Sequence, residues 1–385
     1  MRFAAGVMVV ACMSIAYAQA VTLRVGPGQR LSVPSQAAAI AKDGDTVEIE
    51  AGTYRGDVAV WTQSRLTIRG RGGMARLIAD GRSAESKAIW VVRGGDISIE
   101  KIEFSGARVS DHNGAGIRFE KGRLQITACR FIDNENGILT GSDPASQLDI
   151  SFSEFGNNGD GSGKSHNLYV GHIARLRVVG SYFHHARIGH LLKSRAAVSI
   201  ISHNRLTDES GGRASYELEF PNGGLALVLG NIIEQSATSE NSIIISYGAE
   251  GLGVDSNRLV LVHNTIIDRR RFPGTPLVVR GKPGEVSVQA INNLLIDAGQ
   301  LSLPIGATDR GNQSGTFDEL GTDYRPQDAT MWRVPPERNA VDAALASSLL
   351  QQDPWLLMSM EYKHPAQVSE VLSKTRNAGA MQSIK

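Results

Sequence analysis

Charged residues interrupt two apolar, strand-like stretches near the middle of the 385-residue chain. Lys193 and Arg195 lie in "HLLKSR", and Glu217 and Glu219 lie in "SYELEF". Cations can neutralise the carboxylate of an acidic sugar, whereas two carboxylates can serve as the acid and the base of glycoside hydrolysis. These residues therefore admit two reactions on a polysaccharide. They also admit a solvated sheet face, on which charge pairs stabilise the fold by about 0.2–1 kcal/mol each.

Alternation along a β-strand predicts which of these side chains share a face, because successive residues point to opposite sides. In "NLYVG" and "HLLKSR" it places Tyr169, Lys193 and Arg195 on the outer face. In "SYELEF" it places Glu217 and Glu219 outward and the aromatic and leucine side chains inward. Nearly equal distances to the next apolar strand predict that Tyr169, Lys193 and Glu219 form one column on consecutive turns, about 4.8 Å apart.

Histidines gather in the same part of the chain. Five of the nine lie within 25 residues, namely His166, His172, His184, His185 and His190. We expect His166 to take part in catalysis beside Tyr169, and we expect substrate contacts from Asn113, Asn167, His184 and His190. No histidine pair has a metal-binding spacing with a supporting carboxylate, so neither a metal nor another cofactor is predicted.

Both reactions can be written with these residues. In β-elimination, Lys193 or Arg195 neutralises a uronate carboxylate, His166 or a lysine removes the C5 proton, and Tyr169 protonates the leaving oxygen. In hydrolysis, Glu217 and Glu219 act as the carboxylate pair, with Cα atoms roughly 6.5–7 Å apart from the strand rise. That spacing does not choose between retention and inversion.

A repeat of short strands must position these residues. Asparagines precede the last aliphatic residue of four strands, at Asn204, Asn231, Asn264 and Asn293, with spacings of 27, 33 and 29 residues. Phenylalanines mark earlier repeats, at Phe104, Phe131, Phe155 and Phe183. The pattern predicts an all-β, right-handed, single-stranded parallel β-helix in which the asparagines form a hydrogen-bonded ladder at a corner. A sandwich or propeller would show two-residue turns at shorter intervals.

The ends of the predicted solenoid differ in composition. A short helix around Gln36 to Lys42 is expected to cover the first turn, residues 21–300 to form the β-helix, and residues 301–385 to form an irregular C-terminal tail packed on it. The motifs "GDTVEIEAGTY" and "LTIRGRGG" resemble the opening of pectate-lyase-like parallel β-helix proteins, and "NGAGIRF", "NLYVG" and "KSRA" resemble a secreted bacterial subgroup. This superfamily contains lyases, hydrolases, esterases, epimerases and binding proteins, so the resemblance implies the fold and leaves the reaction to the site.

The first twenty residues have the composition of a secretory signal peptide, which predicts export to the periplasm or beyond. A lipid anchor at Cys12 is the alternative. After this leader only Cys129 remains, so no internal disulfide is possible. A net charge of +1 gives no indication of nucleic-acid binding, no later apolar run is long enough to span a membrane, and the oligomeric state stays open.

The favoured hypothesis is an exported polysaccharide lyase that cleaves an acidic glycan by β-elimination. A glycoside hydrolase with paired glutamates is the first alternative, and a non-catalytic glycan-binding or surface-polysaccharide assembly protein is the second. Motifs of calcium-dependent pectate lyases, polygalacturonases and alginate epimerases are missing from the sequence.

Overall fold

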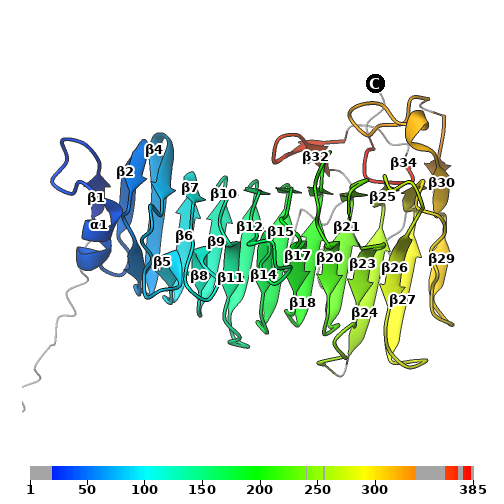
Figure 1. The fold of residues 1–385 in the computed structure, drawn as a ribbon, viewed down its shortest axis with the longest axis horizontal. Helices are drawn as coiled ribbons and strands as arrows, with labels where there is room; N and C mark the ends of the chain where they lie inside the picture. Colours follow the sequence, from blue (N-terminus) through cyan, green and yellow to red (C-terminus); the bar gives the residue numbers. More distant parts are fainter. Residues whose placement is uncertain are drawn as a thin grey trace, which may run out of the picture.

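The chain winds into a solenoid of parallel strands, three to a turn (Figure 1). A computed structural model describes residues 20–239, 241–254, 256–328, 330–334, 360–371 and 376–382. The predicted signal peptide, apart from Ala20, and the alternative anchor Cys12 lie outside these residues. The described chain forms a right-handed parallel β-helix, the handedness that parallel crossovers adopt.

One strand of each turn belongs to a nine-stranded sheet. Its members, in spatial order, are β3 (Ala59–Trp61), β5 (Ala88–Val92), β8 (Ala115–Phe119), β11 (Asn136–Thr140), β14 (Leu168–Val170), β17 (His190–Ser194), β20 (Tyr216–Phe220), β23 (Ile243–Tyr247) and β26 (Thr275–Val279). Every neighbouring pair in this sheet is parallel.

The other two strands of each turn belong to a 21-stranded sheet, within which they form two columns. Column 1 contains β6 (Asp96–Glu100), β9 (Arg123–Thr127), β12 (Gln147–Ser151), β15 (Arg175–Val179), β18 (Val198–Ser202), β21 (Leu225–Leu229), β24 (Asn257–Val262), β27 (Val286–Ile291) and β29 (Thr308–Arg310). Column 2 contains β7 (Ile102–Ser105), β10 (Arg130–Ile132), β13 (Glu154–Gly156), β16 (Tyr182–His184), β19 (Arg205–Thr207), β22 (Ile232–Gln235), β25 (Thr265–Asp268), β28 (Leu294–Ile296) and β30 (Gln313–Gly315). Near the N-terminus, β1 (Thr22–Val25) pairs with the long strand β2 (Thr46–Arg55), and β4 (Arg65–Ile78) connects β2 to both columns.

Like side chains stack on one another along the inside of the solenoid. Four phenylalanine rings stack nearly parallel, at Phe104, Phe131, Phe155 and Phe183. The centroids of successive rings lie 5.1, 4.7 and 4.6 Å apart, and Phe183 pairs in register with Leu206. The predicted aromatic series is therefore confirmed as a ladder in the core. Such offset stacks of buried rings contribute about 0.5–1.5 kcal/mol per pair beyond the area they bury.

The corner between columns 1 and 2 carries the predicted asparagine ladder. The backbone N–H of Asn204 donates to Oδ1 of Asn231 at 2.9 Å, and Asn231 repeats this with Asn264 at 3.0 Å. The ladder continues through Asn293 to Asn312. Each corner turns through a residue of positive φ just before the ladder position, which explains why glycine or histidine often stands there.

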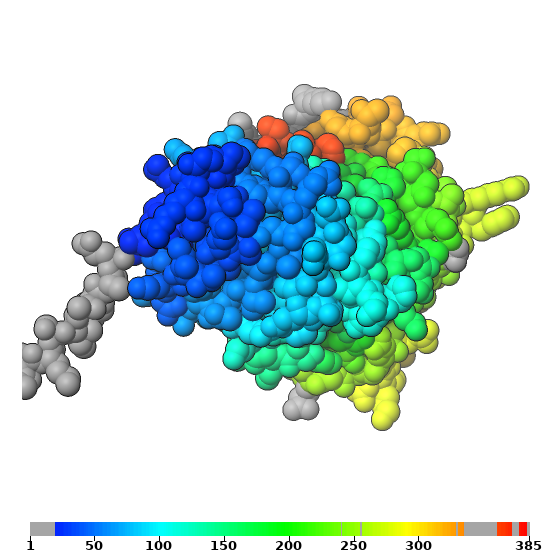
Figure 2. Space-filling view, turned by 60° about the vertical axis from the view of Figure 1, so that its left-hand side comes forward, coloured from blue at the N-terminus to red at the C-terminus, as the bar shows by residue number. Residues whose placement is uncertain are grey.

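The dark-blue N-terminal residues cover the first end of the solenoid (Figure 2). Helix α1 (Pro34–Ile40) carries the buried Ala37 into the N-terminal core, as the sequence predicted for a cap, although it begins and ends two residues earlier than expected. Strand pairing continues past residue 300 to Gly315, so the predicted end of the β-helix was too early. Among the residues described, no helix combines the length and apolar character needed to cross a bilayer.

The described C-terminal segments pack along the outer face of column 2 (Figure 1). They include a 3₁₀ turn, η1 (Phe317–Glu319), and the strands β31 (Arg333–Val334), β32 (Met360–Lys363), β33 (Gln367–Glu370) and β34 (Arg376–Asn377). Leu320, Trp332 and Tyr362 bury apolar surface against Ile232 and Leu294 of the solenoid.

Replacing Phe155 by alanine should lower the free energy of unfolding by about 3–5 kcal/mol, because the change leaves a cavity in the middle of the aromatic ladder. Chemical denaturation monitored by circular dichroism measures the effect. Phe272→Ala is the matched control, since this side chain is 72% exposed and its loss should shift stability by less than about 0.5 kcal/mol. Equal effects of the two substitutions would contradict the role of the ladder.

Candidate active site

The predicted column of tyrosine, lysine and glutamate is present on the outer face of the nine-stranded sheet. Tyr169 of β14 pairs in register with Lys193 of β17, and Lys193 pairs with Glu219 of β20. The flanking Leu168 and Leu218 are fully buried in the core, so the alternation holds here. We call these three residues, together with His166, His190, Arg195 and Glu250, the Lys193 patch.

Two cations and two carboxylates form a closed network in the Lys193 patch. Lys193 Nζ lies 3.0 Å from Glu219 Oε2 and 2.9 Å from Glu250 Oε1. Arg195 Nη2 lies 2.7 Å from Glu250 Oε2, and Arg195 Nε donates to Tyr169 Oη at 2.9 Å. Lys193, Arg195 and Glu219 have side chains only 11%, 13% and 5% exposed, whereas Glu250 is 45% exposed. The charges thus neutralise one another in a layer that is mostly shielded from water.

The environment favours the ionised form of both carboxylates. Burial raises the pKa of Glu219, but the His190 ring and the Lys193 ammonium outweigh burial, and its pKa falls below the usual value. For Glu250, burial again opposes ionisation and is outweighed by hydrogen bonds from Lys193 and Arg195, so its pKa is also lowered. Neither carboxylate is therefore placed to act as a general acid near neutral pH.

Two histidines lie beneath the charged side chains. His166 Nδ1 accepts the backbone N–H of His190 at 3.0 Å and lies 2.9 Å from His190 Nδ1. Because His166 Nδ1 is an acceptor, the proton between the rings belongs to His190, whose Nε2 lies 3.1 Å from Glu219 Oε2. Burial, followed by the charges of His190 and Lys193, lowers the pKa of His166 well below its usual value, so this ring stays neutral.

Aromatic rings hold the two histidines in place. The Tyr169 ring stacks on His166 with centroids 5.5 Å apart, and the Tyr216 ring stacks on His190 at 4.9 Å. Tyr216 was expected to point inward, but it lies half-buried on the outer face at the start of β20. Each histidine is thus clamped between a tyrosine ring and the other histidine, and its orientation is fixed before any ligand binds.

Pockets adjoin the nine-stranded sheet at both ends of its strands. A pocket of about 660 Å³ follows the loops that lead from column 2 into the sheet, and its wall includes Arg108, His112 and Arg187. A smaller pocket of about 160 Å³ lies where the strands leave the sheet, and it is lined in part by Arg195 and Asn222. The Arg195 side of the Lys193 patch therefore opens into a concave surface.

The structure contradicts the predicted position of Glu217. This side chain is fully buried beside Gln235, whose Nε2 lies 3.4 Å from Glu217 Oε2. The alternation was applied one residue too early, because the chain turns a corner as it enters β20 and two consecutive residues face inward. Leu191 and Leu192 show the same doubling one turn before. Glu217 and Glu219 consequently do not form a carboxylate pair on one face.

The structure places three of the residues expected to contact substrate away from the Lys193 patch. Asn167 is fully buried, accepts from Asn158 at 2.8 Å and donates to the His184 carbonyl at 2.9 Å, so it belongs to a second corner ladder. His184 lies on the outer face of column 2, away from the Lys193 patch. Asn113 donates to Asp111 within its own loop at 3.0 Å, outside the patch. His190 does reach the patch, although it lies under Glu219.

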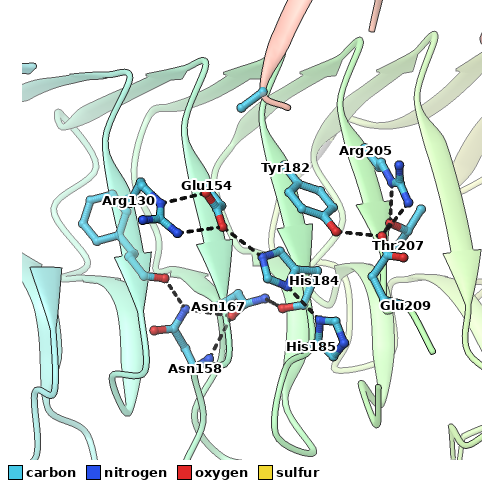
Figure 3. Close-up of polar contacts among 12 residues, drawn as sticks. Arg130, Glu154, Asn158, Asn167, Tyr182, His184, His185, Arg205, Thr207 and Glu209 are labelled. Carbon is cyan, nitrogen blue, oxygen red and sulfur yellow. Dashed lines mark hydrogen bonds and ion pairs between the residues drawn. The ribbon is translucent and has the colours of Figure 1, made fainter. Parts of the chain in front are cut away.

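A separate polar network surrounds His184 on column 2 (Figure 3). His184 Nε2 lies 3.3 Å from Glu154 Oε1, and Arg130 Nε donates to the same carboxylate at 2.8 Å. Burial opposes the ionisation of Glu154, but His184 and Arg130 bring its pKa down to about 2. The Glu154 carboxylate therefore links neighbouring turns of column 2 through Arg130 and His184. His184 belongs to this network and does not lie in the Lys193 patch.

Glu250 and Asn222 complete the site and were missed by the sequence reasoning. Both lie in loops that follow the strands, at "PNGG" and "YGAEGLG", where strand alternation makes no prediction. Asn222 Oδ1 accepts from Arg195 Nη1, and Glu250 bridges Lys193 and Arg195. Within the described residues, no three His, Cys, Asp or Glu side chains are arranged to hold a metal ion.

Glu217→Gln should make the protein more stable at neutral and alkaline pH. Burial and the nearby Asp208 carboxylate raise the pKa of Glu217 well above its usual value, and burial raises the pKa of Asp208 to about 7. The folded state therefore binds more protons than the unfolded state, and stability is lost as pH rises from about 5 towards and beyond 7. The substitution should flatten the fall of Tm with pH, measured by thermal denaturation. Glu285→Gln, in an exposed loop, should leave the slope unchanged, and an unchanged slope for Glu217→Gln would contradict the interpretation.

No protein-family model and no curated protein sequence matches the chain. Among solved structures, the crystal structure of pectate lyase Pel9A superposes with a TM-score of 0.50 and 12% identity over 96% of this chain and 97% of that chain. ORF18 of Geobacillus virus E2 superposes with a TM-score of 0.41 and 12% identity over 90% of this chain and 68% of that chain. The likeness to Pel9A extends over nearly all of both chains, and the protein accordingly has the pectate-lyase-like parallel β-helix fold.

Proposed function

We propose that this protein is an exported polysaccharide lyase, which cleaves an acidic, uronate-containing glycan by β-elimination at the Lys193 patch. The carrying observation is the contact of Arg195 Nε with Tyr169 Oη at 2.9 Å, on the same face as the Lys193 ammonium. The fold is shared with a pectate lyase, but a fold alone does not select a reaction. The chemistry of the side chains therefore carries the proposal.

Lys193 and Arg195 are the groups proposed to bind the uronate carboxylate. Elimination requires removal of the proton at C5, and that proton becomes acidic only when the neighbouring carboxylate is neutralised. A guanidinium and an ammonium held by the same Glu250 carboxylate are close enough for one ligand carboxylate to contact both. Arginine favours planar, two-point contacts of this kind, and lysine adds a point charge.

Tyr169 is proposed to transfer the proton. Tyr169 Oη accepts a hydrogen bond from Arg195 Nε and is proposed to act as the base in its deprotonated form. It takes the C5 proton while the C4–O4 bond breaks and a C4=C5 double bond forms. The same proton then passes to O4 of the leaving chain, so charge and atoms balance without a further reactant. One side chain can perform both transfers when the C5 proton and O4 lie on one face of the sugar ring.

His166 is assigned a different role from the one that the sequence suggested. The ring is 3% exposed, and its Nδ1 already accepts from His190, so it is not placed to meet a substrate. Its stacking contact instead orients Tyr169. The hydrolase alternative loses its carboxylate pair because Glu217 is buried, whereas binding without cleavage remains an outcome that experiment distinguishes.

Incubation with a panel of uronate polymers should produce ultraviolet absorbance from the new conjugated double bond, together with new reducing ends in equal number. Reducing ends without that absorbance would instead indicate hydrolysis. Binding of the polymers without either product would leave a non-catalytic glycan-binding protein.

Tyr169→Phe should lower kcat by about 10²–10⁴-fold with little change in affinity for the polymer, because only the proton-transferring hydroxyl is removed. Initial rates of double-bond formation and calorimetric binding measure the two quantities. Tyr216→Phe is the matched control. This ring stacks on His190 as Tyr169 stacks on His166, but among the described residues it accepts no hydrogen bond from Arg195. Full activity of Tyr169→Phe would exclude the proposed proton transfer.

A further inference from the structure

We propose that Glu250 is an internal competitor for the ligand carboxylate, which holds the two cations of the Lys193 patch until an acidic sugar displaces it. The inference rests on the proposed function of the patch and adds a residue that governs its ligand selectivity. Its basis is that one side-chain carboxylate already makes the contacts that a uronate carboxylate would need, with Oε1 on Lys193 and Oε2 on Arg195.

Each guanidinium nitrogen of Arg195 already has one acceptor. Nε donates to Tyr169, Nη1 donates to Asn222, and Nη2 pairs with Glu250 at 2.7 Å, which leaves the second N–H of each Nη outside these contacts. A ligand carboxylate that bridges Arg195 and Lys193 as Glu250 does must therefore replace the Glu250 carboxylate between them. Replacing Tyr169 would remove the proton-transfer group, and Asn222 is neutral, so the exchange of one carboxylate for another at Nη2 is the step that conserves charge.

Lys193 favours the same exchange. Its two carboxylate partners differ in accessibility, because Glu219 is 5% exposed whereas Glu250 is 45% exposed. Glu219 also lies over the buried His190, with His190 Nε2 3.1 Å from Glu219 Oε2. Moving Glu219 would leave buried charges without partners, at a high energetic cost, whereas Glu250 can rotate into water and be hydrated. Glu250 is thus the partner that a ligand can displace.

The backbone around Glu250 allows the side chain to leave without unfolding the loop. Before this residue, Gly248 N donates to the Phe220 carbonyl at 2.8 Å, and after it, Gly253 N donates to the Asn222 carbonyl at 2.8 Å. The loop is therefore tied to the neighbouring turn on both sides of the glutamate. Displacement needs only rotation about side-chain bonds, and the loop keeps Glu250 close enough to return when the product leaves.

Internal competition selects for charge. A neutral sugar cannot replace the two ionic contacts of Glu250, so Lys193 and Arg195 stay paired with the Glu250 carboxylate and the sugar does not bind to them. A uronate exchanges one carboxylate for another at little net electrostatic cost. The apparent dissociation constant of an acidic ligand is then raised by the fraction of molecules in which Glu250 occupies the cations.

Calorimetric titration with D-glucuronate, and with D-glucose as the neutral probe, tests the proposal on the full-length protein. Glu250→Gln should bind glucuronate about 10-fold more tightly than the wild type, because the neutral amide competes less well for the cations, and glucose binding should not change. Glu285→Gln is the matched control, since this glutamate is 43% exposed on a neighbouring loop and does not contact the patch. With an acidic polymer that is cleaved, Glu250→Gln should lower KM.

The outcomes separate the role of Glu250 as an internal competitor, which we call the gate, from the proposed elimination reaction. If the wild type forms unsaturated ends but Glu250→Gln binds glucuronate no more tightly, the gate is wrong and the lyase function stands. If Glu250→Gln gains affinity but no polymer of the panel is cleaved by elimination, the gate stands and the proposed reaction is wrong. If neither protein binds glucuronate, the gate is wrong, and the elimination assay on polymers alone decides the reaction. A loss of kcat in Glu250→Gln with unchanged affinity would make Glu250 part of the catalytic machinery and overturn its role as a competitor.

Discussion

Parallel pairing between successive turns is the constraint on which the rest of the structure depends. Each strand must lie about 4.8 Å from its equivalent on the next turn, so every side chain stands directly above and below the same position of neighbouring turns. This spacing suits flat rings and amides, which explains the phenylalanine ladder and the asparagine ladder. It also forces side chains on the outer face into columns, whether their charges attract or repel.

The Lys193 patch exploits this constraint. Tyr169, Lys193 and Glu219 are one repeat apart, close enough for a lysine to pair with the glutamate of the next turn. Ion pairs that are largely shielded from water stabilise a fold only weakly, because desolvation of the charges offsets most of their attraction. Such a network is weak evidence for stability, and perturbed carboxylates cluster at functional sites, which supports the ligand-binding role that we propose for the patch. His190 Nε2 lies 3.1 Å from Glu219 Oε2 beneath the cations.

The histidines of this part of the chain fall into two groups with different surroundings. His166 and His190 lie under the nine-stranded sheet's charged face, stacked between tyrosines, and contact each other through Nδ1. His184 lies on column 2, where it contacts Glu154 and the adjacent His185 near the C-terminal segments (Figure 3). These histidines are close in sequence and lie in neighbouring turns. They point in different directions because each turn has three strands, and His184 and His190 belong to different ones.

The sequence by itself determined the repeat, the ladders and the column of Tyr169, Lys193 and Glu219, because these follow from strand spacing and alternation. Only the tertiary structure decided the orientation of side chains at corners and in loops, where the alternation of a strand does not apply. The corner before β14 turned Asn167 inward, and the corner before β20 did the same to Glu217. The loops after β20 and β23 brought Asn222 and Glu250 to the cations. The physical reason is that a strand imposes a two-residue period on its side chains, whereas the path of a corner or a loop depends on packing against the next turn of the solenoid.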